Sequence, residues 1–182
     1  MKKTLRVVAI MILITISYRV ANSCSVSHVM TGKEICKEST YIVRATAKKC
    51  SQPGKISFEI SEKLKGNEIP QVIEIEGSLN QKDDFNDREV PRNFVRPEGR
   101  HGSCVARVYK ENAEFLLFLV EYNNNYTPYW AALAATNDQL VSTSDPWLVW
   151  VRAELNKKEQ VSFKHLIFST NNYFQVFLDI NS

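Results

Sequence analysis

Hydrophobic and polar residues alternate along much of this chain with the two-residue period of a half-buried β-strand. Residues 55–60 place Ile56, Phe58 and Ile60 on one face and polar side chains on the other, and residues 72–76 repeat the pattern. Because alternating residues of a strand point to opposite faces of a sheet, both runs predict strands with one buried face.

Three further runs bring the number of predicted strands to five. Residues 41–47 are rich in β-branched and aromatic side chains. Residues 115–120 are continuously apolar, which is typical of a central strand that is buried on both faces. Residues 129–135 follow a predicted turn at the asparagines 123–125. Between the third and fourth strands, residues 79–103 are polar and contain prolines and glycines, which predicts a long loop.

One helix is predicted over residues 145–155. Asp145 is a favourable N-cap and Pro146 stands at the first helical position. Apolar residues recur after them at helical spacing, beginning with Trp147 and Leu148. The whole pattern predicts a mostly β fold, a five-stranded closed barrel of the OB type with one or two short helices.

The two ends of the chain have patterns of their own. Residues 1–23 begin with basic residues, continue with an apolar run of eleven residues, and end on the small residues Ala21-Asn22-Ser23. This order predicts a cleaved signal peptide, after which the mature chain begins at Cys24. We expect one domain over residues 24–155, followed at residues 156–182 by an extension whose alternating pattern predicts a β-hairpin.

The charge of the chain is concentrated in the predicted signal peptide. Residues 1–23 contain four of the 23 basic residues and none of the 20 acidic ones, so 19 basic and 20 acidic residues remain after cleavage. This near-neutral remainder predicts neither nucleic-acid binding nor membrane insertion. We expect a secreted, extracellular protein, which in a bacterial host would be periplasmic or anchored by a lipid on Cys24.

The four cysteines are Cys24, Cys36, Cys50 and Cys104. An even number of cysteines in a secreted chain predicts two disulfides, for which three connectivities exist. None of the spacings is that of a structural zinc site. We therefore expect a disulfide-bonded domain without a metal of its own.

Residues of catalytic type do not form a recognisable motif. His28, His101 and His165 are far apart and lack the spacing of a metalloprotease site. Ser103 lacks the flanking glycines of a hydrolase nucleophile. The sequence predicts no enzyme activity and no cofactor.

Two polar motifs outside the predicted strands have other interpretations. Asp83, Asp84 and Asp87 do not match a calcium-binding loop, and we interpret them as solvated loop charges. Asn125 begins an Asn-Tyr-Thr sequon that is usable for glycosylation only in a eukaryotic host.

The placement of the cysteines relative to the predicted strands resembles that of the netrin-like module. An N-terminal Cys24 and then Cys36 precede a Tyr-Ile-Val-Arg-Ala strand, a Lys65-Gly66 turn separates two alternating strands, and Cys104 leads into Glu-Phe-Leu-Leu. Within that family, the chain is most similar to the inhibitory domain of the tissue inhibitors of metalloproteinases. The resemblance covers about residues 24–155.

The resemblance implies a disulfide between Cys24 and Cys104. Elimination then leaves Cys36 with Cys50, although the strand between these two cysteines is longer when extended than a disulfide can span. The family begins Cys-x-Cys, whereas this chain reads Cys24-Ser25-Val26. One disulfide of the family is therefore missing here, because no cysteine occupies the expected partner position either.

The resemblance implies inhibition of a secreted zinc metalloproteinase. In that family the α-amine and carbonyl of the first cysteine bind the zinc of the protease, and the next side chain enters its specificity pocket. Here these positions are Cys24 and Ser25, followed by Val26. The alternative is a netrin-like module that binds another extracellular protein or a glycan without inhibiting a protease. A secreted enzyme is the third functional class.

Overall fold

A computed structural model describes residues 28–100, 106–129, 133 and 137–157. The predicted signal peptide, the Cys24-Ser25-Val26 edge, Cys104 and the predicted C-terminal hairpin lie outside these residues. Within the described ranges, no helix is long and apolar enough to cross a membrane.

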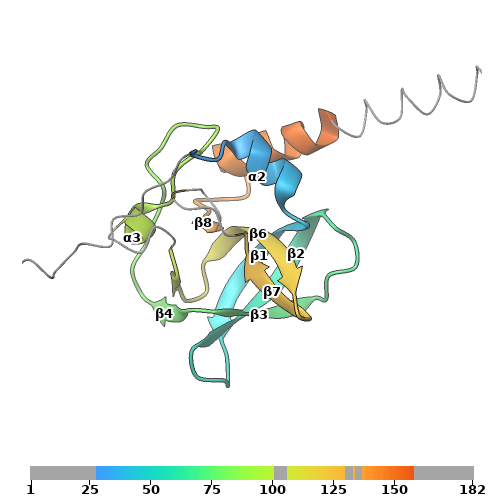
Figure 1. The fold of residues 1–182 in the computed structure, drawn as a ribbon. Helices are drawn as coiled ribbons and strands as arrows, with labels where there is room; N and C mark the ends of the chain where they lie inside the picture. Colours follow the sequence, from blue (N-terminus) through green and yellow to red (C-terminus); the bar gives the residue numbers. More distant parts are fainter. Residues whose placement is uncertain (1–27, 101–105, 130–132, 134–136, 158–182) are drawn as a thin grey trace, which may run out of the picture.

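The described part of the chain is mostly β, with one curved sheet of six strands (Figure 1). Five strands follow the spatial order β3-β2-β1-β6-β7, and β8 pairs with β6. Their bounds are Tyr41–Lys49 (β1), Lys55–Lys65 (β2), Val72–Glu76 (β3), Glu114–Tyr122 (β6), Asn125–Pro128 (β7) and Asn137–Gln139 (β8). All pairs in this sheet are antiparallel.

Strand β6 organises one side of the sheet. One edge of β6 pairs with β1, while the other edge pairs with β8 near Leu116 and with β7 near Val120. Because β7 and β8 share this edge, they lie one after the other along β6. A single long strand therefore holds three neighbours.

The sheet curls into a nearly closed barrel. Its two outer strands, β3 and β7, run in the same direction and are not hydrogen-bonded to one another. Residues of the two strands nevertheless approach to within 8 Å between Cα atoms. A seam without backbone pairing therefore remains where the barrel would close.

The interior of the barrel is apolar. Side chains from β1, β2, β3 and β6 fill it, and their alternation follows the pleat. Phe58, Tyr109 and Phe115 pack edge to face on one another, with ring centroids 5.1–6.0 Å apart. These rings contribute large buried areas in a preferred aromatic geometry.

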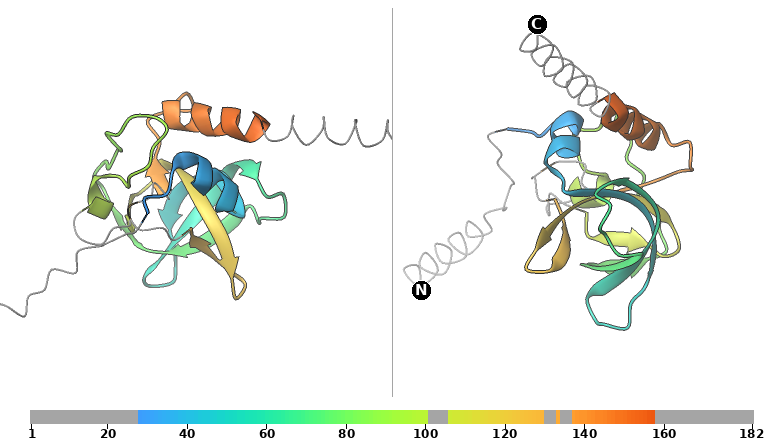
Figure 2. Two further views of the ribbon diagram at one scale, coloured as in Figure 1. Left: turned by 45° about the horizontal axis from the view of Figure 1, so that its top comes forward. Right: turned by 90° about the vertical axis from the view of Figure 1, so that its right-hand side faces the viewer.

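Two helices cover one side of the barrel (Figure 2). Helix α2 spans Gly32–Glu38, and the other helix, called the second helix below, occupies residues 146–157, after α3 in the chain. Leu116 and Phe118 of β6 point outward to these helices, whereas Phe115 and Leu117 point inward. The continuous apolar run of β6 is thus buried on both faces, as its sequence predicted.

The segment between β3 and β6 is a long connection with short elements. Strand β4 (Ser78–Asn80) pairs in parallel with β5 (Val108–Lys110), and helix α3 spans Pro97–Arg100. Phe85 forms an isolated bridge with Gln139 of β8. The predicted long loop therefore lies against the barrel rather than away from it (Figure 1).

The predicted elements agree with this structure in most places. The strands beginning near residues 41, 55, 72 and 115 are all present, and so is the helix after Asp145. The strand predicted over residues 129–135 is displaced: β7 already ends at Pro128, and the described residues Tyr129 and Leu133 are not in a strand.

The displacement follows from the turn that precedes β7. Asn123 and Asn124 both have positive φ, 50° and 59°, as a two-residue hairpin of type I′ requires. Because this turn uses only two residues, the returning strand begins at Asn125 rather than at residue 129.

The predicted Cys36–Cys50 disulfide is not present. Cys36 is buried in α2, and Cys50 follows the opposite end of β1. Within the described residues no cysteines are joined. Nine extended residues span about 30 Å, far beyond the Cα separation of a disulfide. The objection from strand length was therefore correct.

Candidate functional site

The predicted inhibitory edge, Cys24-Ser25-Val26, lies outside the described residues, which begin at His28. The described contacts nearest to it in sequence are those at the start of α2. The backbone N–H of Gly32 donates a hydrogen bond of 2.9 Å to Asn93 Oδ1, across 61 residues of sequence. The start of α2 is thus attached to the long segment that leads toward Cys104.

A capping box fixes the start of α2. Thr31 Oγ1 accepts from the backbone N–H of Glu34, and Glu34 Oε2 accepts from the backbone N–H of Thr31 at 2.7 Å. His28 Nε2 lies 3.2 Å from the same carboxylate. The hydrogen bonds from Thr31, and secondarily the one from His28, lower the pKa of Glu34 to about 2.

Gly32 allows a close approach between three elements. A Cβ atom at this position would lie 2.8 Å from Trp147 Cη2, 3.2 Å from the carbonyl oxygen of Arg92 and 3.2 Å from Pro91 Cβ. A side chain here would therefore overlap the second helix or the long segment. The absence of a side chain lets α2, residues 91–92 and Trp147 pack together.

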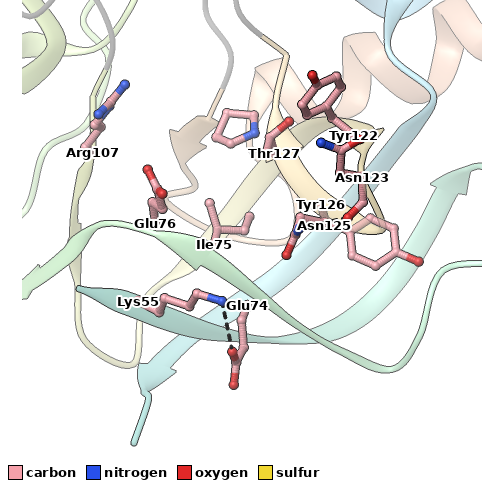
Figure 3. A pocket seen from close by; sticks show the side chains of 11 residues that line it. Lys55, Glu74, Ile75, Glu76, Arg107, Tyr122, Asn123, Asn125, Tyr126 and Thr127 are labelled. Carbon is pink, nitrogen blue, oxygen red and sulfur yellow. Dashed lines mark hydrogen bonds and ion pairs between the residues drawn. The ribbon is translucent and has the colours of Figure 1, made fainter. Parts of the chain in front are cut away.

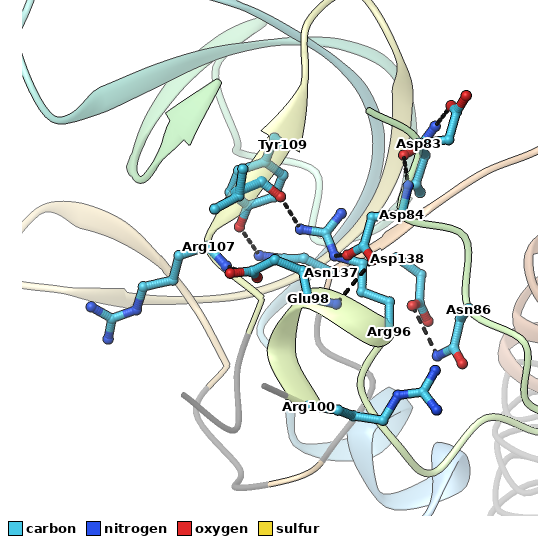
Figure 4. Close-up of polar contacts among 12 residues, drawn as sticks. Asp83, Asp84, Asn86, Arg96, Glu98, Arg100, Arg107, Tyr109, Asn137 and Asp138 are labelled. Carbon is cyan, nitrogen blue, oxygen red and sulfur yellow. Dashed lines mark hydrogen bonds and ion pairs between the residues drawn. The ribbon is translucent and has the colours of Figure 1, made fainter. Parts of the chain in front are cut away.

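A layer of buried charged residues holds the long segment on the barrel (Figure 4). The guanidinium of Arg96 is almost completely buried; its Nε lies 3.0 Å from Asp84 Oδ2, and its Nη2 donates to the carbonyl of Val108 at 2.7 Å. It also lies over the rings of Tyr109 and Phe115, 4.8 and 5.1 Å from their centroids.

Arg92 forms the second centre of this layer. It lies 3.7 Å from Asp138 Oδ2 and 3.8 Å from Asp145 Oδ1, and both carboxylates are buried. Asn86 donates to Asp138 Oδ1 at 3.1 Å. Burial raises the pKa of Asp138, because desolvation outweighs the nearby guanidinium charges.

The layer continues through α3 to the last described residue before Cys104. The backbone N–H of Glu98 donates to Asp84 Oδ1 at 2.9 Å, and Glu98 Oε2 accepts from the backbone N–H of Arg107 at 2.9 Å. Arg100 pairs with Asp87 at 2.5 Å. These contacts join Arg100 and Arg107, on either side of the 101–105 interval, to Asp87 and Glu98 of the long segment.

The barrel seam contains a cavity of about 560 Å³ (Figure 3). Its walls come from Lys55 at the start of β2, residues 74–76 of β3, Arg107, and the β6–β7 hairpin over residues 122–128 except Asn124. The cavity therefore lies between the two strand edges that are not hydrogen-bonded to each other.

The polar groups around this cavity differ in whether they form ion pairs or hydrogen bonds. Lys55 Nζ lies 3.7 Å from Glu74 Oε2, and the thiol of Cys50 donates to Glu74 Oε1 at 3.3 Å. Within the described residues, the carboxylate of Glu76 has no ion pair or hydrogen bond. Tyr122 is 70% exposed, and burial raises the pKa of the partly buried Tyr126.

Candidate metal ligands do not converge in the described ranges. No group of three or more His, Cys, Asp or Glu side chains there could hold a metal ion. His28 contacts Glu34, while His101 and His165 lie outside the described residues.

Of the three aspartates interpreted as solvated loop charges, Asp84 differs from that interpretation, whereas Asp83 and Asp87 are exposed. Asp84 is 13% exposed and pairs with Arg96, whereas Asp83 and Asp87 are 45% and 68% exposed. The sequence signal for this layer was the alternation of arginines and aspartates between residues 83 and 100. The partners Asp138 and Asp145 are too distant in sequence to be recognised from it.

Comparison with known proteins finds no family model that matches the chain and no curated protein that matches it.

Proposed function

We propose that this protein is a secreted netrin-like domain that inhibits a zinc metalloproteinase through its amino-terminal edge, Cys24-Ser25-Val26. The spatial order β3-β2-β1-β6-β7 supports the OB-type barrel that this family implies. The cover of two helices on one side of the barrel also fits that architecture.

The observation that carries the proposal is the attachment of Gly32 to Asn93. An inhibitor of this type needs its first residues beside the segment that contains Cys104, so that a Cys24–Cys104 disulfide holds them there. Gly32 lies eight residues after Cys24 and is hydrogen-bonded to that segment. The Cys24–Cys104 disulfide would therefore add a covalent link between two parts of the chain that are already in contact. The Cys24–Cys104 disulfide is part of the proposal.

The chemistry required of the edge is simple. An α-amino group has a pKa of about 8, so its neutral form is accessible to a metal near neutral pH. The amine and carbonyl of Cys24 would bind the zinc of the protease, and the small hydroxyl side chain of Ser25 would enter its specificity pocket. The metal belongs to the target.

The test is one alanine inserted before Cys24 of the mature protein. The insertion displaces the α-amine by about 3.5 Å and should reduce inhibition of a panel of secreted zinc proteases by orders of magnitude. The matched control carries one alanine after Ser182, and both variants should keep the wild-type melting temperature. N-terminal sequencing must first establish that the mature chain begins at Cys24.

Equal inhibition by the inserted and control proteins would overturn the zinc-binding mechanism. Absence of inhibition by the native protein would favour the second candidate, a netrin-like module that binds another extracellular protein or a glycan. Two observations favour that candidate: Val26 replaces the second cysteine of the family pattern, and the barrel seam contains a cavity whose lining does not include the edge residues.

A further inference from the structure

The cavity in the barrel seam has no role in the proposed inhibition. Its volume of about 560 Å³ is within the range of small-molecule sites in proteins. Two strand edges without mutual backbone pairing border it, so N–H and C=O groups of β3 and β7 are available at its walls. An occupant of this position could form neutral hydrogen bonds with these groups.

The charges of the cavity disfavour a strongly charged occupant. Two basic residues, Lys55 and Arg107, face two acidic ones, Glu74 and Glu76. The first pair of opposite charges, Lys55 and Glu74, is already in contact at 3.7 Å. Because the charges of the lining cancel, an anionic polymer would meet as much repulsion as attraction.

The spacing of the strands excludes an inserted peptide strand. A strand between β3 and β7 would need two hydrogen-bonding spacings, about 9.6 Å. Residues of β3 and β7 already lie within 8 Å of each other between Cα atoms. The barrel would therefore have to open before an extended peptide could pair with both edges.

The remaining side chains are those that recognise sugars. The ring of Tyr122 is 70% exposed at the rim, and an aromatic face can stack on the C–H face of a pyranose. Beside it are the amides of Asn123 and Asn125, and across the cavity is the unengaged carboxylate of Glu76 (Figure 3). Amides and carboxylates can each bind pairs of hydroxyl groups.

We propose that the seam between β3 and β7 is a binding site for a neutral oligosaccharide, stacked on Tyr122 and hydrogen-bonded by Glu76 and Asn123. The residues that line this site do not include Cys24, Ser25 or Val26. The site therefore does not depend on whether the protein inhibits a protease.

The test uses the full mature protein made in a bacterial host, so that Asn125 carries no glycan. The probes are cellotriose, chitotriose, mannotriose and maltotriose, titrated by calorimetry and by shifts of backbone amide NMR signals. We expect at least one probe to bind and to shift amides of residues 122–128. Tyr122→Ala and Glu76→Gln should each weaken that binding by about tenfold or more.

Matched controls lie on the same domain but outside the cavity. Phe94→Ala removes an aromatic ring that is 38% exposed, and Glu59→Gln neutralises an exposed carboxylate of β2. Neither should change the affinity. The protein with alanine inserted before Cys24 should also bind the sugar normally, even if it no longer inhibits.

Three results would overturn the proposal. They are the absence of binding to all four probes, equal binding by Tyr122→Ala, Glu76→Gln and the controls, and preferential binding of a sulfated oligosaccharide that 0.5 M salt abolishes. Circular dichroism of Tyr122→Ala and Glu76→Gln, two exposed substitutions, should match the wild type, so loss of binding would not reflect unfolding.

Discussion

The barrel interior and the charged layer beneath the long segment are both buried, but they are held together by different forces. In the interior, apolar rings such as Phe58 and Phe115 pack edge to face on each other. In the charged layer, Arg92 and Arg96 need three carboxylates at defined positions, two of them on other parts of the chain. Apolar packing specifies volume, whereas a buried charge specifies partners.

This difference has a consequence for stability. Removing apolar atoms leaves a cavity, and its cost depends on the volume lost. Removing one member of a buried ion pair leaves the other member desolvated without compensation, so the cost depends on which partner remains. The two regions should therefore respond differently to conservative and to paired substitutions.

The largest effect is expected in the barrel interior. Phe115→Ala should lower the free energy of unfolding by about 3–5 kcal/mol, because it removes a completely buried ring that contacts Phe58 and Tyr109. Phe115→Leu should cost less than Phe115→Ala, because it keeps most of the apolar volume and loses only the ring contacts with Phe58, Tyr109 and Arg96. Urea denaturation measures both, and an equal cost for the two variants would contradict volume-based packing.

The stability of the charged layer should depend on whether each buried charge keeps its oppositely charged partner. Arg96→Met keeps much of the apolar volume but leaves Asp84 without its guanidinium, and should cost about 3 kcal/mol. Adding Asp84→Asn to Arg96→Met should recover part of that loss, because the remaining partner is then neutral. A double-mutant cycle by urea denaturation tests this coupling. Additive costs would show that the two residues act independently.

The close packing of Gly32 against Trp147 and residues 91–92 leaves no room for a side chain, so an added methyl group should lower stability. Gly32→Ala places a methyl group 2.8 Å from Trp147 Cη2 and should cost about 1–3 kcal/mol by overpacking. The adjacent exposed residue supplies the control, since Lys33→Ala should change stability by less than about 0.5 kcal/mol. Thermal denaturation would reveal the difference, and equal melting temperatures would indicate that the packing around Gly32 is loose.

The smallest effect is expected at the exposed cap of α2. The pKa of Glu34 is about 2 in the folded protein, compared with 4.5 for an ordinary glutamate. A lowered pKa stabilises the fold above pH 4.5, and that contribution is lost as the pH falls toward 2. Glu34→Gln should therefore melt slightly below the wild type at pH 6, and the two melting curves should converge near pH 2. A difference that stays constant over this range would contradict the assignment.

Local sequence patterns predicted most of the strands because each pattern reports the burial of its own residues. The alternation in residues 72–76 matches β3 residue for residue, and the apolar run at 115–120 lies inside β6. Helix α2 was missed, although Thr31 and Glu34 have the spacing of a capping box. Its seven residues are too few for helical periodicity to be visible.

The candidate sites were less accessible to sequence reasoning. Lys55, Glu76, Arg107 and Tyr122 are separated by up to 67 positions and have no shared motif, yet the curvature of the sheet gathers them around one cavity. The predicted edge at Cys24 could be named because the family resemblance assigns a role to the N-terminus itself.

Burial, strand order within each hairpin and the capped helix after Asp145 follow from the amino-acid sequence alone, since they depend on residues that are close along the chain. The seam between β3 and β7, the partners of Arg92 and Arg96, and the contact of Gly32 with Trp147 were decided only by tertiary structure. These features depend on the direction and curvature of elements that are distant in sequence. Hydrophobic patterning identifies which face of an element is buried, but it does not identify the element that will cover that face.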